Sequence, residues 1–156
     1  MIRRAKEKDI PRILELLSQV LEIHASIRPD VFISGTTKYT EEEIIGILQN
    51  DSTPVYVAAD ENDETVGYAF CVLKQQPFSN NMVQFSSLFI DDLCVDEKYR
   101  GKKIGESLFR FVKEEAKRLG CYEITLNVWE GNDDALAFYR RMEMQPRSTT
   151  LEYRID

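Results

Sequence analysis

A short basic segment that contains two glycines is the part of the chain whose residue types best fit a chemical task. It follows an apolar run that ends at Val95 and leads into a helical pattern. Its residues are Arg100, Gly101, Lys102, Lys103, Ile104, Gly105 and Glu106. Backbone N–H groups at a helix start are free to bind anions, and glycine lets a ligand approach the backbone closely. The segment therefore predicts a phosphate site, or alternatively a strand–helix turn whose basic side chains are simply solvated.

Two common nucleotide-binding motifs do not fit this segment. The P-loop requires G-x-x-x-x-G-K-[ST], whereas Gly101 and Gly105 are spaced too closely and no Lys-Ser or Lys-Thr pair follows. The dinucleotide motif G-x-G-x-x-G is also absent. Both mononucleotide-binding folds are therefore excluded.

Two adjacent acids, Asp91 and Asp92, interrupt the apolar run of residues 83–95. A carboxylate in such a place could accept a proton from a cationic substrate. Because side chains alternate along a strand, we expect the two to lie on opposite faces, so that at most one faces a cleft. The alternatives are solvated acids at a β-bulge, or a general attraction for cations.

The other residues with reactive side chains favour structural roles. His24 continues the apolar stripe of a helix, so we expect it to be partly buried, with a substrate contact as the alternative. Cys71, Cys94 and Cys121 lie in apolar stretches without C-x-x-C spacing or neighbouring histidines. We therefore expect reduced thiols in a cytoplasmic protein, and no metal site.

Composition limits the class of protein. The chain has 156 residues, which suits a single domain over 1–156, and 43% of them are apolar. Twenty Lys and Arg against 27 Asp and Glu give a net charge of −7, so nucleic acid is a poor partner. The longest apolar run, residues 68–73, is far shorter than a membrane span. We expect neither a nucleic-acid nor a membrane partner.

Periodicity and turn signals place the elements that must position these residues. Helices are expected over residues 10–24, from the Thr40 capping box to about residue 50, between Gly101 and Gly120, and over 133–142. Strands are expected over residues 2–5, 55–59, 65–73, 83–95, 123–129 and 148–155. The order is β-α-α-β-β-β-α-β-α-β, which indicates a mixed α/β fold with helices packed on one sheet.

Three stretches resemble motifs of the GNAT superfamily of N-acetyltransferases. Residues 100–105 resemble its R-G-x-G-x-G/A pyrophosphate loop, although Lys103 stands where the family usually has glycine. Residues 93–99 resemble its "L-x-V-x-P-x-Y" strand, and residues 127–139 resemble its "V-x-x-x-N-x-x-A-x-x-F-Y" signature. The resemblance implies a GNAT-like α/β (α+β) fold with a mixed, mostly antiparallel central sheet flanked by helices.

The resemblance also implies roles for particular residues. Acetyl-CoA would be the cosubstrate, with its pantetheine arm on the backbone of Leu93, Cys94 and Val95. Its pyrophosphate would rest on the N–H groups of residues 100–106, near Asn132, which can also act as a plain helix N-cap. Tyr139 matches the tyrosine that often protonates the CoA sulfur. Asp91 matches a position that is a glutamate base in some relatives, and would act through water.

The function implied is direct acetyl transfer to a primary amine, either a small cationic amine or a peptide or protein amine. The reaction needs no metal and no covalent enzyme intermediate. The Cys94 thiol is the one group that could form such an intermediate if it were reactive. Residues 28–32 and the helix after them are expected to line the acceptor side. The alternative is a noncatalytic CoA-binding regulatory module with the same fold. A homodimer is allowed but not required.

Overall fold

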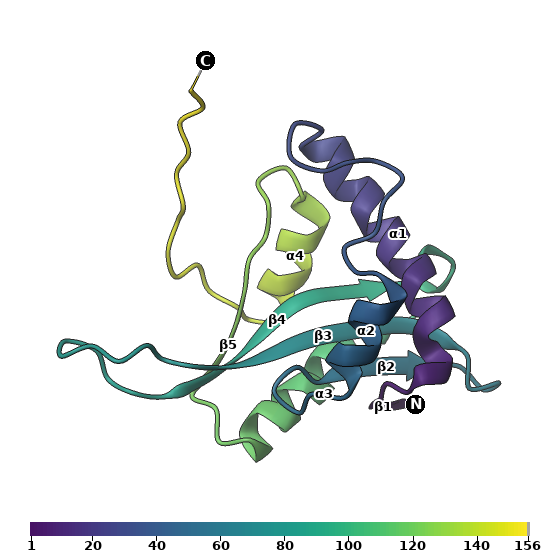
Figure 1. The fold of residues 1–156 in the computed structure, drawn as a ribbon, viewed down its shortest axis with the longest axis horizontal. Helices are drawn as coiled ribbons and strands as arrows, with labels where there is room; N and C mark the ends of the chain where they lie inside the picture. The colour runs from purple at the N-terminus through teal and green to yellow at the C-terminus, as the bar shows by residue number, and fades with distance from the viewer. Residues whose placement is uncertain (156) are drawn as a thin grey trace.

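The computed structural model describes residues 1–155 and contains one five-stranded sheet (Figure 1). The strands are β1 (Ile2–Arg4), β2 (Val55–Ala59), β3 (Thr65–Gln75), β4 (Ser86–Val95) and β5 (Glu123–Leu126). Their order in the sheet follows their order in the chain. Neighbouring strands are antiparallel except β4 and β5, which are parallel. The expected mixed, mostly antiparallel sheet is therefore confirmed.

Helices cover both faces of this sheet. The helices are α1 (Ile10–Ile27), α2 (Glu41–Leu48), α3 (Ile104–Arg118) and α4 (Asp133–Arg141), with short 3-10 turns at η1 (Glu7–Asp9) and η2 (Glu97–Tyr99). One core cluster joins the apolar sides of α1 and α2 to Val55, Val57 and Phe70. The second lies on the other face, where α3 and α4 pack on Leu88 and Ile90. The sheet is therefore the middle of three layers.

Local sequence signals account for where several helices begin and end. Pro11 lies in the first turn of α1, where its missing N–H leaves no hydrogen bond unmade. The Thr40 hydroxyl accepts from the Glu43 N–H, and the Glu43 carboxylate accepts from the Thr40 N–H, so the expected capping box is present. Gly120, just after α3, has φ +74°, the left-handed conformation expected of a helix C-terminal glycine.

The expected closing strand at residues 148–155 is wrong. Residues 145–155 form no helix or strand and make no backbone–backbone hydrogen bond within the described chain. They run away from the sheet as an extended tail (Figure 1). Smaller differences lie at strand ends: residues 83–85 precede β4, Ala5 follows β1, and β5 stops at Leu126 instead of residue 129. Ala5 and Phe85 still make one backbone hydrogen bond each at the ends of the ladders, because the Ala5 N–H donates to the Val55 carbonyl and the Phe85 carbonyl accepts from the Gln76 N–H.

None of the helices within residues 1–155 combines the length and the apolarity that crossing a membrane requires.

Candidate active site

The sheet opens between β4 and β5. Their parallel ladder ends at the pair Ile90 and Leu126, yet β4 continues to Val95 with only β3 beside it. Backbone groups at the end of β4 therefore present a free edge toward the chain that follows β5. This stretch contains Leu93, Cys94 and Val95, the residues expected to pair with an extended ligand arm. Leu93 and Val95 pack toward α3, while Cys94 packs toward α1.

The basic loop begins five residues beyond the end of β4. None of the backbone N–H groups of residues 101–106 donates a hydrogen bond to any group of residues 1–155. Gly101 has φ +83° and Lys103 has φ +62°, so the chain turns sharply before α3 starts at Ile104. Unpaired N–H groups at the positive end of a helix dipole form an anion site. The backbone is therefore arranged for the predicted phosphate site.

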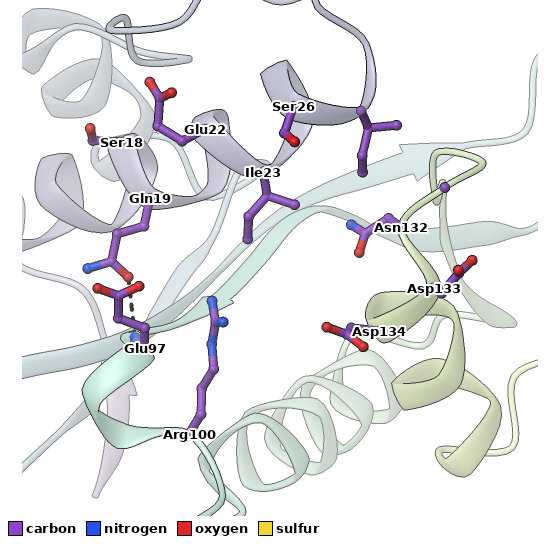
Figure 2. Close-up of a pocket in the computed structure, with 12 residues that line it drawn as sticks. Ser18, Gln19, Glu22, Ile23, Ser26, Glu97, Arg100, Asn132, Asp133 and Asp134 are labelled. Atoms are coloured by element: carbon purple, nitrogen blue, oxygen red, sulfur yellow. Dashed lines mark hydrogen bonds between the residues drawn. The ribbon is translucent and has the colours of Figure 1, made fainter.

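A cavity of about 750 Å³ lies beside this loop (Figure 2). Its lining comes from α1, the start of α4 and the turn between β4 and α3: Ser18, Gln19, Glu22, Ile23, Ser26, Ile27, Glu97, Arg100, Gly131, Asn132, Asp133 and Asp134. The Arg100 side chain extends into it and forms no salt bridge within residues 1–155 (Figure 2). One arginine without a carboxylate partner suits a bound anion.

Asn132 and Tyr139 both belong to α4. The Asn132 side chain accepts a hydrogen bond from the Ala135 N–H at 3.3 Å, so the helix N-cap role is present at the cavity wall. The Tyr139 ring packs against Phe138 and Phe109, with ring centroids 5.1 and 6.5 Å away. Burial raises the pKa of Tyr139 well above its usual value, and the charge of Asp92 raises it further. The hydroxyl therefore keeps its proton and can donate it.

The two acids of β4 lie on the same face, so the expectation of opposite faces is wrong. Asp92 is opposite Phe70 and Ile90 is opposite Cys71, which leaves Asp91 as an extra residue in a β-bulge. The Tyr39 hydroxyl donates to Asp91, and the Tyr68 hydroxyl donates to Asp92 at 2.7 Å. Both tyrosines pack with Phe70 on the side of α1 and α2.

Asp91 is held by two partners. Besides the Tyr39 hydroxyl, the Lys38 ammonium lies 3.1 Å from its carboxylate. Asp91 also lines a second cavity of about 460 Å³ between α2 and the sheet, with Glu43 on its opposite wall. The structure thus puts the sequence-predicted acid at a cavity, and it adds Lys38 and Tyr39, which the sequence analysis missed.

Asp92 is a second titratable group of the site, which the sequence alone did not favour as the base. Burial raises the pKa of its carboxyl to about 6, although the Tyr68 hydrogen bond and the Lys38 charge lower it. The residue nevertheless keeps some solvent exposure. A carboxyl with a pKa near neutral pH is well suited to accept a proton. The two adjacent acids are visible in the sequence, but which of them is desolvated depends on the bulge, which only the structure shows.

The remaining candidates occupy structural surroundings. Burial raises the pKa of the Cys94 thiol to about 12, so it is no ready nucleophile. Burial lowers the pKa of His24, whose ring lies 5.1 Å from that of Phe32. Phe32 in turn contacts Trp129, with centroids 5.4 Å apart. Across residues 1–155 no cluster of three potential metal ligands occurs.

Comparisons with known proteins match most of this chain to one family. A profile of the acetyltransferase (GNAT) family matches residues 17–144. A thialysine N-epsilon-acetyltransferase from Bos taurus is 27% identical over 155 residues, covering 93% of this chain and 84% of that protein. A glucosamine 6-phosphate N-acetyltransferase from Arabidopsis thaliana is 24% identical over 146 residues, covering 92% and 87%.

Solved structures share the fold. A variant of the BH1408 protein from Bacillus halodurans superposes with a TM-score of 0.95 at 32% identity, over 99% of both chains. An aminoglycoside N-acetyltransferase in complex with CoA has a TM-score of 0.73 at 15% identity, over 100% of this chain and 99% of that one. At 15% identity, this likeness shows only that the two proteins share a fold.

Proposed function

The chain belongs to the acetyltransferase (GNAT) family, and on that premise we propose that it transfers the acetyl group of acetyl-CoA directly to a primary amine. The observation that carries the proposal is the row of unpaired N–H groups at residues 101–106, next to the opening between β4 and β5. A pyrophosphate would bind the unpaired N–H groups, and an extended pantetheine arm would lie in the opening between the strands.

The loop and the end of β4 fit this cosubstrate in complementary ways. The N–H groups of residues 101–106 would bind the pyrophosphate oxygens, with Arg100 adding charge. The free backbone edge of residues 93–95 would pair with the amide groups of the arm. Lys103 has a left-handed φ and an exposed side chain, and its N–H donates to no group of residues 1–155 although the residue is not glycine.

Acyl transfer requires a neutral amine and a proton for the leaving thiolate. Asp92, with its pKa near 6, would be ionised at neutral pH and would accept the ammonium proton, directly or through water. The amine nitrogen then bonds to the thioester carbonyl carbon, and the carbon–sulfur bond breaks. Tyr139 would donate its hydroxyl proton to the sulfur, and the second proton lost by the new amide nitrogen would return to the Tyr139 oxygen, directly or through water. Asp91, the acid named from the sequence, stays a candidate for proton transfer and for holding the amine.

Charge supports a cationic acceptor. Asp91 and Glu43 line the cavity under α2, and the chain as a whole carries a charge of −7. Several relatives are named for amine substrates, including thialysine and glucosamine 6-phosphate. We propose a small cationic amine or a peptide amine as the acceptor class. The three free cysteines support a reducing, cytoplasmic setting.

Release of free CoA thiol from acetyl-CoA tests this proposal. The full chain is mixed with acetyl-CoA and each of a panel of small amines and peptides, and thiol is followed with a colorimetric reagent. We expect at least one amine to accelerate release, and Tyr139→Phe to slow it at least ~10-fold with acetyl-CoA binding retained. Binding without release for every amine would instead support the noncatalytic module. A chain that acetyl-CoA neither binds nor stabilises against heat would contradict both functions.

A further inference from the structure

An ammonium group of the protein itself already lies at the acid that would hold the acceptor. Lys38 belongs to the loop of residues 28–40 between α1 and α2, and its Nζ is 3.1 Å from the Asp91 carboxylate. Burial raises the pKa of Asp92, and the charge of Lys38 lowers it, so Lys38 also lies close to Asp92. A primary amine acceptor would place its own ammonium in the same position before it loses a proton.

The Asp91 carboxylate has one partner on each oxygen. Oδ2 accepts from the Tyr39 hydroxyl, and Oδ1 contacts the Lys38 ammonium. Tyr39 is held by its ring, which stacks on Phe70 with centroids 5.4 Å apart. A second ammonium that approached Oδ1 would meet the like charge of Lys38 at short range. An acceptor therefore reaches this oxygen only when Lys38 leaves it.

Lys38 can leave without disturbing the sheet or a helix. Its side chain is 44% exposed, whereas that of Asp91 is 19% exposed. Residues 33–39 make no backbone–backbone hydrogen bond within residues 1–155, so no ladder fixes the part of the loop that carries Lys38. A lysine side chain is a flexible stem with a strongly hydrated ammonium. Rotation of that stem into water opens Asp91 toward the cavity of about 460 Å³ that Asp91 lines.

We propose that Lys38 is a specificity-determining residue, which occupies Asp91 until the ammonium of an acceptor displaces it. The inference rests on the proposed function, in which the acceptor is a cationic amine. An ammonium replaces the charge that Asp91 loses when the pair opens, whereas a neutral molecule leaves the carboxylate without a cation. The pair therefore favours cationic acceptors over neutral ones. It also weakens the binding of every cationic acceptor, because only the fraction of molecules in which the pair is open can bind it.

The expected size of this effect follows from the strength of ion pairs of similar exposure. A partly exposed Lys–Asp pair favours its closed form over its open form by up to about 5-fold. Removal of the Lys38 ammonium should therefore lower the Kd of a simple alkylammonium by about 2–6-fold. The Kd should rise instead if Lys38 binds an anionic group of the acceptor or only supports the loop. The direction of the change thus decides between these roles.

Binding of n-butylammonium chloride to the full chain at neutral pH tests the proposal, with the amide NMR shifts of Asp91 and Asp92 as the readout. Lys38→Met should bind butylammonium about 2–6-fold more tightly than the parent chain does. Lys8→Met is the matched control, because it removes the same charge from a pair with Asp63 that lies outside the cavity. This control should leave the Kd unchanged. Adding Lys38→Met to Asp91→Asn should bring no gain in affinity either.

Three results of this titration would each overturn the proposal. They are unchanged or weaker binding by Lys38→Met, equal tightening by Lys8→Met, and butylammonium that moves neither amide in the parent chain or in Lys38→Met. With any amine that accelerates thiol release, Lys38→Met should also lower KM, and a higher KM would overturn the proposal too. The titration contains no acetyl-CoA, so a chain that releases no thiol with any amine contradicts the proposed function without altering the titration. The two therefore fail separately.

Discussion

Replacing Asp92 with asparagine should make the protein more stable at neutral pH while impairing catalysis. Burial raises the pKa of Asp92 to about 6 from an ordinary 3.8, a difference of about two units. At ~1.36 kcal/mol per unit, ionised Asp92 costs the folded state up to about 3 kcal/mol. Asparagine cannot ionise, and its side-chain oxygen can still accept the hydrogen bond from the Tyr68 hydroxyl.

The pH dependence of this cost has a definite sign. Between pH 3.8 and 6 the folded state binds the Asp92 proton more tightly than the unfolded state does, so the contribution of Asp92 to stability falls as pH rises through this window. Above it, the full cost is present. The free energies of unfolding of the parent chain and Asp92→Asn should therefore be similar near pH 4 and differ by up to about 3 kcal/mol at pH 8.

Urea unfolding between pH 4 and 8, followed by far-ultraviolet circular dichroism, measures this difference. Asp91→Asn is the matched control, because that carboxylate is already paired with Lys38 and Tyr39 and its loss should give no stabilisation. In parallel, kcat/KM of the parent chain should rise with pH through about 6, as Asp92 ionises. A variant less stable than the parent at pH 8, or a difference that is the same at every pH, would refute the reasoning.

Two further substitutions test the backbone strain in the basic loop and the buried carboxylate of Asp9. Lys103→Gly should raise the free energy of unfolding by about 0.5–1 kcal/mol, because a left-handed conformation strains any side chain. Lys102→Gly is the control and should lower the free energy of unfolding by a similar amount. If urea unfolding shows that both variants lose the same free energy of unfolding, the prediction is contradicted. Asp9→Ala should cost about 3 kcal/mol, because its carboxylate is 3% exposed and accepts from Arg3, the Lys6 N–H and Thr65. A change in Tm under ~2 °C for Asp9→Ala would show that those donors find other partners.

Features set by neighbouring residues could be predicted from the sequence. The Thr40 capping box and the left-handed glycine after α3 each depend on a few adjacent residues. The basic loop could likewise be located, because its glycines and its position between a strand and a helix are local signals. Its unpaired N–H groups follow directly from that position.

Features that depend on residues far apart in the sequence could not be predicted from it. The bulge at Asp91 depends on how β4 aligns with β3, and simple alternation therefore assigned the two acids to the wrong faces. Residues 148–155 have the composition of a strand, but they make no backbone hydrogen bond to β5, the open edge of the sheet in the described chain. Lys38 and Tyr39 reach Asp91 across more than fifty residues of sequence, so no local pattern indicated them.

Hydrogen exchange of the full chain with and without acetyl-CoA tests the central claim most directly. The claim is that the N–H groups of residues 101–106 bind the pyrophosphate and that the free edge of residues 93–95 pairs with the pantetheine arm. We predict that acetyl-CoA slows exchange at both segments, while residues 77–84 of the β3–β4 loop exchange as before. Unchanged exchange at residues 101–106 under saturating acetyl-CoA would contradict the account.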